Sequence, residues 1–381
     1  MPMFLIIIIS GYILINSYLF VRGWQILPSE TSFRLVYAIL FWPVVLSYLG
    51  SRVFENILPF SLADVMTWIG SFWIAAFIYL FLAVLVLDAL RAVNHFLPFF
   101  PSFVTENYAR AKYVTAGVVL GAVALTLIVG FINARTPRVT ELEIPINKQA
   151  GELKSLNIVM AADIHAGTIV GHSWLKQIVD KINAQSPDIV LLPGDIIDNN
   201  IALLVQKNTG EELRRIQARY GVFAALGNHE YICCGSEAAV RYLTEHSITV
   251  LRDQSIKIDD SFFLVGRDDY AMSRWTGEKR KTLEALMDGI DRRFPIILMD
   301  HQPYNLHEAA ENRVDLQLSG HTHHGQLWPV NYITKAMYEL AWGYKRIGDT
   351  HYYVTNGAAV WAPSVRIGNR PEIVFIRLNF Q

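Results

Sequence analysis

Cysteine is scarce in this sequence. Only two of its 381 residues are cysteines, and these two, Cys233 and Cys234, are adjacent. Neighbouring cysteines bridge each other only under local strain, so a framework of disulfides is excluded. We therefore predict that both are small buried residues beside a loop, and they leave the redox compartment open.

Charge is also scarce, and it is balanced. Lys and Arg together number 33 and Asp and Glu 34, which gives a formal net charge of -1. A nucleic-acid-binding domain usually carries a strongly basic face, so this balance gives no reason to expect nucleic acid as a partner. The sequence also contains no internal repeat and no low-complexity tract.

The few charges are distributed unevenly. They are sparse from Met1 to about Asn133, whereas from Arg135 onward the chain reads like an ordinary soluble domain. Hydrophobic residues make up 52% of the chain, a share typical of a membrane protein. We predict a transmembrane domain over residues 1–134 and a second domain over residues 135–381.

Four apolar runs in the first domain predict four transmembrane helices. A helix rises about 1.5 Å per residue and the hydrocarbon core is about 30 Å thick, so about 20 apolar residues span it. The first run lacks the basic start and small-residue cleavage site of a signal peptide. The second is the least regular because it contains Pro43, and Asp64 and Asp88 are expected at helix ends near water. The predicted helices cover about residues 3–21, 33–50, 65–88 and 113–133.

Basic residues in the loops indicate the orientation. Cytoplasmic loops of membrane proteins carry an excess of Lys and Arg. If the N-terminus lies outside, the inner loops hold Arg22, Arg34, Arg91, Arg110 and Lys112, and the outer side holds Arg52, Arg135 and Arg138. Five against three predicts that the second domain lies outside the cytoplasm.

The second domain alternates apolar strands with helices, which indicates an α/β fold. Five of the strand-like runs are each followed by a polar cluster, and open α/β sheets place ligands and catalytic groups at these strand ends. The runs are Leu156–Ala161 before Asp163 and His165, Ile189–Leu192 before Asp195, Val222–Leu226 before Asn228, His229 and Glu230, Pro295–Met299 before Asp300 and His301, and Leu316–Leu318 before His321 and His323.

The residue types in these clusters point to metal chemistry. Asp, Asn and His supply oxygen and imidazole nitrogen, which suit Mn²⁺, Fe²⁺ or Zn²⁺. Two such ions about 3.5–4 Å apart need a bridging carboxylate and terminal ligands on each side. Together they activate a hydroxide and clamp phosphate oxygens. The ordered set therefore predicts a site for two divalent metal ions that can act on a phosphate group.

The clusters resemble the five blocks of the calcineurin-like metallophosphoesterase superfamily, and the match runs from about Leu156 to the C-terminus. The resemblance implies a four-layer α/β/β/α sandwich. The segments that resemble its YkuE/YaeI-like phosphodiesterase branch are Gly194–Asp198, Gly266–Asp269, Gly325–Gln326 and the tail from Val354 through Arg366 to Ile373. One departure is His324, which stands where that branch has glycine; its imidazole is expected to narrow the pocket or touch the leaving group.

The resemblance also implies a role for each residue. The first metal would be bound by Asp163, His165 and His323, and the second by Asn228, His301 and His321, with Asp195 bridging. His229 would protonate the departing alkoxide, since an imidazole titrates near neutral pH. Glu230 would orient the loop. Apart from the resemblance, the positions of Asp198 and Asp300 beside ligands make them candidate partners for imidazoles. Arg366, in a Gly-rich tail, would contact phosphate or form a structural salt bridge.

Four helices are more than an anchor requires, so the leading hypothesis is hydrolysis of a phosphodiester or phosphoanhydride in a lipid or lipid-linked substrate at the bilayer surface. Within the family, UDP-2,3-diacylglucosamine diphosphatases supply a cytoplasmic alternative that acts on a lipid A precursor. A catalytically silent sensor or scaffold is disfavoured because every expected ligand is present. A transporter is disfavoured because no charge lies deep in the spans. The expected partners are a phosphorylated small-molecule or lipid substrate and membrane lipids.

Overall fold

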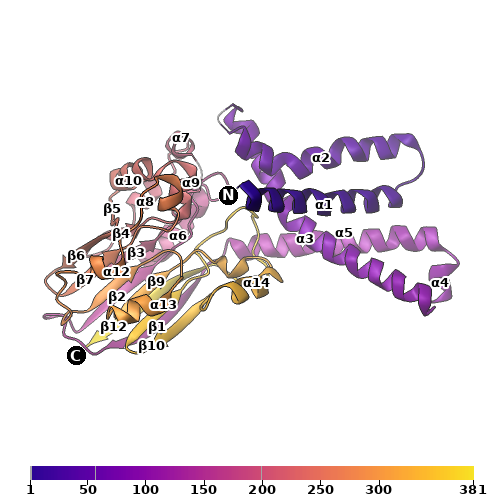
Figure 1. The fold of residues 1–381 in the computed structure, drawn as a ribbon. Coiled ribbons are helices and arrows are strands. Elements are labelled where there is room, and N and C mark those ends of the chain that lie inside the picture. The colour runs from indigo at the N-terminus through magenta and orange to yellow at the C-terminus, as the bar shows by residue number, and fades with distance from the viewer. Residues whose placement is uncertain (1, 56, 199) are drawn as a thin grey trace. The chain divides into compact units, whose positions relative to one another are not determined.

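The computed structural model describes residues 2–55, 57–198 and 200–381. The chain forms two compact units, which are labelled element by element in Figure 1. The first comprises the chain up to residue 131 together with residues 362–365, and the second comprises residues 132–361 and 366–381. The assignment of residues 362–365 to the helical unit is not evident from the sequence.

Four long helices dominate the first unit, as predicted. They are α1 (Pro2–Ile26), α2 (Thr31–Val53), α3 (Phe60–Phe96) and α5 (Tyr108–Ala134), with the short α4 (Ser102–Thr105) between the last two. Each of the four is long and apolar enough to cross a membrane. Many of their large apolar side chains are exposed, among them Leu14, Leu40 and Leu125. A bilayer is the solvent that would cover such surfaces.

Helix α3 is longer than the apolar run that predicted it. Its 37 residues extend about 55 Å at 1.5 Å per residue, well beyond a hydrocarbon core of about 30 Å. Asp88 therefore lies inside α3 and not at its end, which corrects the prediction. The carboxylate forms ion pairs with Arg22 of α1 at 2.5 Å and with Arg91 at 3.0 Å.

Two six-stranded sheets form the second unit. In the first sheet the order is β1 (Arg138–Ile146), β12 (Glu372–Phe380), β2 (Ser155–Met160), β3 (Ile189–Pro193), β4 (Val222–Ala225) and β5 (Ile248–Val250). In the second it is β10 (Gly343–Ile347), β11 (Thr350–Val354), β9 (Leu316–Ser319), β8 (Ile296–Met299), β7 (Phe262–Gly266) and β6 (Gln254–Ile258). Strands β2 to β5 run parallel, and so do β7, β8, β9 and β11. The carboxyl ends of these strands therefore share one edge of each sheet.

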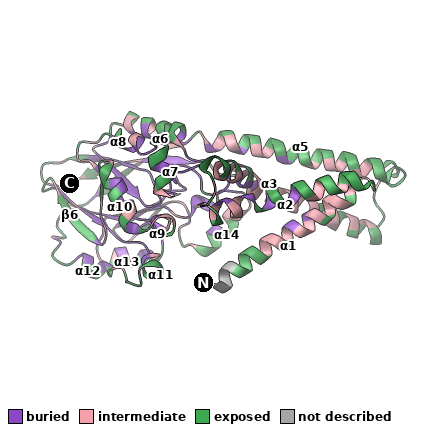
Figure 2. Cartoon of the chain, turned by 90° about the horizontal axis from the view of Figure 1, so that it is seen from above, coloured by how far each residue is buried: buried purple, intermediate pink, exposed green. Residues whose placement is uncertain are grey.

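The sheets pack face to face and helices cover their outer faces. Leu191 of β3 and Ile297 of β8 belong to one buried cluster between the sheets. The next residue, Leu298, points the other way and packs with α12 (Leu283–Leu286) and α13 (Leu306–Glu311). Helices α6 (His172–Ala184) and α10 (Ser236–Glu245) pack on the first sheet. Figure 2 shows the buried strands inside this unit, which has the predicted four-layer α/β/β/α arrangement.

The remaining helices are short and lie in the connections. They are α7 (Ile201–Gln206), α8 (Glu211–Arg214), α9 (Asn228–Cys233), α11 (Met272–Trp275), the 3₁₀ turn η1 (His323–Gly325) and α14 (Val330–Met337). Helix α9 and turn η1 follow the carboxyl ends of β4 and β9. They therefore stand where the sequence places two of its polar clusters.

Candidate metal centre

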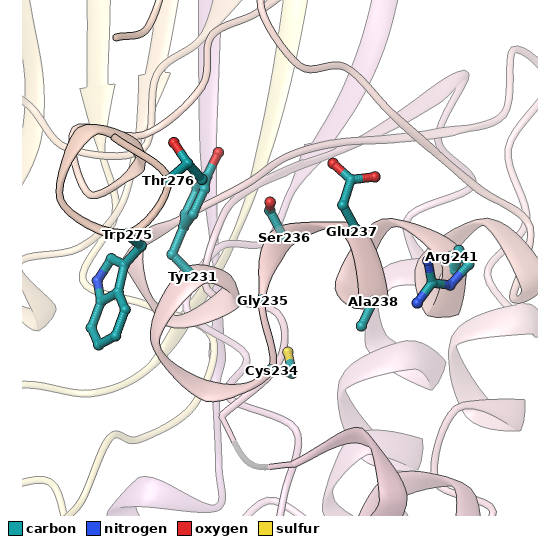
Figure 3. Close-up of a pocket in the computed structure, with 9 residues that line it drawn as sticks. All are labelled: Tyr231, Cys234, Gly235, Ser236, Glu237, Ala238, Arg241, Trp275 and Thr276. Carbon is teal, nitrogen blue, oxygen red and sulfur yellow. The ribbon is translucent and has the colours of Figure 1, made fainter. Parts of the chain in front are cut away.

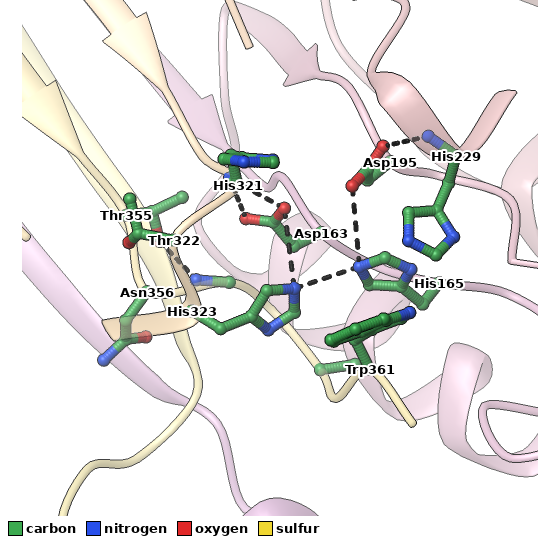
Figure 4. A network of polar contacts seen from close by, with 12 residues as sticks. Asp163, His165, Asp195, His229, His321, Thr322, His323, Thr355, Asn356 and Trp361 are labelled. Carbon is green, nitrogen blue, oxygen red and sulfur yellow. Dashed lines mark hydrogen bonds and ion pairs between the residues drawn. The ribbon is translucent and has the colours of Figure 1, made fainter. Parts of the chain in front are cut away.

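Loops from both sheets bring six of the seven predicted ligands together. Asp163 and His165 follow β2 and Asp195 follows β3, whereas His301 and His321 follow β8 and β9 of the other sheet. In the described part of the chain, three overlapping sets of donor atoms each lie within 4.8 Å: Asp163 with His165 and His323, His165 with Asp195 and His229, and Asp195 with His301 and His321. Figure 4 shows the first set, in which the side chains face one another. The two sheet edges therefore meet at a single site.

The backbone at these loops adopts left-handed conformations that side chains rarely tolerate. The φ angle is 54° at Asp163, 51° at His165 and 52° at Asp195. It is 72° at His321 and 46° at His323. Each such residue costs about 1–3 kcal/mol, and strain of this kind gathers at functional sites. Five of the predicted ligands share this conformation, which supports a functional site at this edge.

Two glycines allow the carboxylates to approach the opposite loops. A Cβ on Gly227 would lie 2.2 Å from Asp195 Oδ1, and one on Gly320 would lie 2.5 Å from Asp163 Oδ2. Both distances are shorter than real Cβ contacts. The glycines that precede Asn228 and His321 are therefore required by packing around the centre.

Asp195 occupies the position that two of the donor sets share. Its Oδ2 lies 3.1 Å from His301 Nε2 and 3.8 Å from His165 Nε2. Its Oδ1 accepts the backbone N–H of His229 at 2.8 Å. Burial would raise the pKa of Asp195, but His301 and His229 outweigh burial and hold this pKa well below its usual value. The carboxylate is therefore ionised, as a bridging ligand must be.

Three of the surrounding imidazoles are neutral, the form that binds metals. Burial lowers the pKa of His165, and it lowers the pKa of His321 to about 3. Burial and the charge of Arg366 lower the pKa of His323 well below its usual value. His301 differs: burial would lower its pKa, but Asp195 raises it well above the usual value. A cation between Asp195 and His301 would replace the proton that they share.

The donor set fits divalent cations. Burial raises the pKa of Asp163 to about 7, and a nearby cation would restore the ionised carboxylate. The side-chain Oδ1 of Asn228 is buried and has no hydrogen-bond partner among the described residues. A buried carbonyl oxygen of this kind is a ready metal ligand. Carboxylate, amide oxygen and imidazole together match the preferences of Mn²⁺, Fe²⁺ and Zn²⁺.

His229 lies beside the ligands and contacts a carboxylate of its own. Its Nδ1 is 3.2 Å from Asp198 Oδ1, which also lies 3.4 Å from His165 Nδ1. Burial would lower the pKa of His229, but Asp195 and Asp198 outweigh burial and raise it. The ring therefore keeps its proton near neutral pH, as a general acid must. Distance alone would equally allow His229 to bind a metal with His165 and Asp195.

Glu230 ties the loop after β3 to the loop after β4. Its buried carboxylate accepts the backbone N–H groups of Asp195 at 3.1 Å, Ile196 at 2.7 Å, Ile197 at 2.9 Å and Gly227 at 2.8 Å. All four donors are buried within the site. Because Asp195 and Asn228 belong to these two loops, Glu230 sets the position of one with respect to the other.

The side chains of Arg366 and His324 contact other side chains of the protein, His323 and Trp342. Arg366 is fully buried, and its Nη2 lies 3.0 Å from His323 Nδ1. A guanidinium only donates hydrogen bonds, so His323 accepts at Nδ1 and stays uncharged. The ring of His324 packs against the Trp342 indole at 5.0 Å between centroids. These contacts make Arg366 a support of His323, and they place the His324 ring on Trp342.

Among the described residues Asp300 contacts no imidazole, which corrects the prediction. It accepts hydrogen bonds from Arg267 at 3.3 Å and from Arg280 at 2.9 Å. The sequence analysis also missed Trp361. Its half-exposed ring lies 5.8 Å from the ring of His229 (Figure 4). Trp361 follows no apolar strand directly, so the strand-end pattern gave no signal for it.

Cys233 ends α9 and Cys234 follows it, and both are only half-buried, whereas the sequence predicted buried residues. Both are free thiols, with 2.6 Å between their Sγ atoms. Cys234 lines a hollow of about 410 Å³ together with Tyr231 and Trp275, as Figure 3 shows. Among the described residues that line this hollow, none is a predicted metal ligand.

Comparison with known proteins assigns the chain to a family. The calcineurin-like phosphoesterase family matches residues 156–325. An uncharacterized metallophosphoesterase of Aquifex aeolicus is 30% identical over 227 residues, which cover 59% of this chain and 85% of that protein. The chain belongs to the calcineurin-like phosphoesterase family. Members of this family are metal-dependent phosphoesterases, and the three donor sets of this chain could hold such metals.

Membrane-bound relatives of this phosphoesterase are also known. A transmembrane protein with metallophosphoesterase domain from Danio rerio is 33% identical over 286 residues, or 72% of this chain and 65% of that protein. Its counterpart from Bos taurus is 30% identical over 267 residues, or 66% of this chain and 60% of that protein. The phosphoesterase thus spans slightly less than two thirds of these two relatives. Together with its four candidate membrane helices, they indicate a membrane protein.

Proposed function

We propose that this phosphoesterase uses two metal ions to hydrolyse a phosphodiester or phosphoanhydride in a lipid or lipid-linked substrate at the membrane surface. The overlap of the three donor sets carries the proposal. His165 and Asp195 each belong to two sets, and shared ligands are what two closely spaced cations require.

Seven residues would hold the two cations. One would bind Asp163, His165 and His323, the other would bind Asn228, His301 and His321, and Asp195 would serve both. When bound, the cations supply a hydroxide nucleophile at neutral pH and neutralise charge on the phosphate oxygens. The protein itself fixes the ligands in strained loops, and it keeps Asp195 ionised and His321 neutral.

His229 would donate a proton to the departing oxygen. Asp198 supports this role because it lies 3.2 Å from His229 Nδ1 and raises the pKa of the ring. A carboxylate at one nitrogen orients an imidazole so that the other nitrogen faces the reaction. The half-exposed ring of Trp361 beside His229 would form an apolar wall for the leaving group.

The connection to the membrane supports a lipid substrate. Helix α5 ends at Ala134 and β1 begins at Arg138. The intervening Arg135–Pro137 segment spans at most about 11 Å when extended, so the catalytic unit stays near the bilayer surface. The loop charges favour a position outside the cytoplasm, and a cytoplasmic position with a lipid A precursor as substrate is the alternative.

Turnover by the full chain in detergent micelles tests the proposal. We expect hydrolysis of detergent-dispersed phospholipid that a chelator abolishes and Mn²⁺ restores. Asp195→Asn should lower this rate more than about a hundredfold, because residues behind metal ligands already contribute up to that much. Asp180→Asn, which changes an exposed surface carboxylate, is the matched control. Turnover of soluble esters only would overturn the lipid substrate, and full activity of Asp195→Asn would overturn the metal centre.

A further inference from the structure

Helix α14 has an apolar surface that faces outward. Tyr332 is 62% exposed, Ile333 61% and Met337 65%, while the polar Thr334 is buried. The preceding Trp328 is 48% exposed. A surface helix in water shows the opposite pattern, with apolar residues turned toward the core. Clustered exposed apolar side chains of this kind mark an interaction surface.

The exposed residues of α14 form one continuous face. At 100° per residue, Tyr332, Ile333, Ala336 and Met337 fall within an arc of about 140°. Lys335 is also exposed and stands at the border of this arc. Aromatic rings, aliphatic side chains and a flanking lysine are the residues of helices that lie flat in a membrane interface.

The chain connects this face to the end of a membrane helix. Asn133, in the last turn of α5, donates hydrogen bonds to the carbonyl oxygens of Arg366 at 3.0 Å and Asn369 at 2.6 Å. The backbone N–H of Trp328 donates to the carbonyl oxygen of Ile367 at 2.7 Å. Both attachments are to the same short segment, residues 366–369. The start of α14 therefore lies close to the point where α5 reaches the catalytic unit.

Helix α14 is also packed tightly against the loop of the metal ligands. A Cβ on Gly325 would lie 2.5 Å from the backbone nitrogen of Asn331 and 2.7 Å from the carbonyl carbon of Val330. Gly325 ends η1, which begins at His323. No side chain fits between η1 and α14. The depth of α14 in a bilayer would therefore fix how far His321 and His323 lie from the bilayer surface.

We propose that α14 and Trp328 insert into the polar–apolar boundary of the bilayer and thereby hold the metal centre at the level of lipid phosphate groups. The occupant of this face is the phospholipid surface. The reason is that the end of the membrane helix α5 and the start of α14 are both hydrogen-bonded to residues 366–369. The positioning of lipid phosphate rests on the proposed function, whereas the insertion of α14 does not.

Spin labels on the full chain test the insertion. In a Cys233→Ser, Cys234→Ser background, one nitroxide is attached at Ile333→Cys and, separately, at Asp260→Cys. Asp260 is exposed in the turn before β7, at the opposite end of the sheet from the metal ligands. In phosphatidylcholine nanodiscs with one protein each, we expect the label at 333 to be more accessible to oxygen and less accessible to a nickel chelate than the label at 260. Equal accessibilities overturn the proposal, and so does dipolar broadening between labels at 333 in liposomes, which indicates a second copy on this face.

Turnover separates this proposal from the proposed function. Ile333→Glu should lower turnover of vesicle-bound phospholipid at least about fivefold, because it replaces an apolar side chain in the membrane interface with a charged one. Turnover of soluble bis(p-nitrophenyl) phosphate should stay within about twofold. If the unaltered protein hydrolyses only the soluble ester, the lipid function fails while the label result still decides the insertion. An equal loss on both substrates would indicate a folding defect and count against the positioning role.

Discussion

In the candidate metal centre, residues with the same side chain differ in their chemistry because their neighbours differ. His229 and His321 carry the same side chain. Asp195 and Asp198 outweigh burial and raise the pKa of His229, whereas burial lowers the pKa of His321 to about 3. One ring is therefore suited to donate a proton and the other to bind metal as a neutral ligand.

The pH dependence of Asp198→Asn follows from this difference. Asp198 raises the pKa of His229, so its removal lowers that pKa and fewer rings are protonated at a given pH. We expect the loss of kcat on the alkaline side to begin about one pH unit lower, as measured on an alkyl phosphodiester. Asp180→Asn is the surface control. An unmoved alkaline limb would show that His229 is not the titrating acid.

Leaving-group dependence distinguishes the two possible roles of His229. A general acid contributes about 10²–10⁴-fold when the leaving group is a poor one. We expect His229→Asn to lower kcat on alkyl diesters by this amount and on p-nitrophenyl esters far less. The metal content should remain two ions per chain. Loss of an ion from His229→Asn would instead make His229 a ligand.

At the scale of elements, the site depends on how strand ends are joined. The loop after β3 carries Asp195, and α9 after β4 begins with Asn228. Glu230 joins them through four backbone hydrogen bonds. Buried N–H groups without acceptors cost about 1–3 kcal/mol each, so this one carboxylate stabilises two loops at once.

Replacement of Glu230 tests whether its carboxylate holds the two loops together. In Glu230→Gln an amide NH₂ replaces one carboxylate oxygen and opposes two of the four backbone donors. We expect the free energy of unfolding to fall by about 2–4 kcal/mol and metal affinity to fall with it. Thermal unfolding and metal titration of the full chain measure both effects. Glu237→Gln, at an exposed carboxylate of α10, should leave both values unchanged. If the two substitutions had equal effects, Glu230 would have no special role in joining the loops.

At the scale of the whole molecule, candidate membrane helices and a domain of the calcineurin-like phosphoesterase family are combined in one chain. The catalytic unit follows α5 after a short connection, and α14 presents apolar side chains close to the same point. A phosphoesterase held at a surface in this way meets lipid phosphates at high local concentration. We therefore expect the full chain to act on membrane substrates more readily than the second unit would alone.

The orientation of the whole molecule has its own test. Five basic residues near the inner ends of the helices against three on the outer side predict that the catalytic unit is outside the cytoplasm. Protease added to intact spheroplasts should then cleave the C-terminal unit before lysis. A cytoplasmic protein produced in the same cells serves as the control for leakage. Protection of the catalytic unit until lysis would reverse the orientation and favour the lipid A alternative.

The sequence by itself determined the elements that depend on local pattern. Apolar runs of sufficient length predicted α1, α2, α3 and α5, since membrane thickness alone sets that length. The runs before Asp163, Asp195 and His321 predicted β2, β3 and β9 within one residue of their bounds. Strand ends and residue types also predicted the ligand candidates that the structure brings together, because chain-local chemistry specifies both.

Only the tertiary structure decided which distant residues face one another. It placed His301 3.1 Å from Asp195 across two sheets, paired Asp300 with arginines, and put Trp361 beside His229. It also turned the apolar side of α14 outward and buried Arg366 behind His323. No local pattern encodes these partners, because each contact joins segments whose proximity depends on the packing of the whole unit.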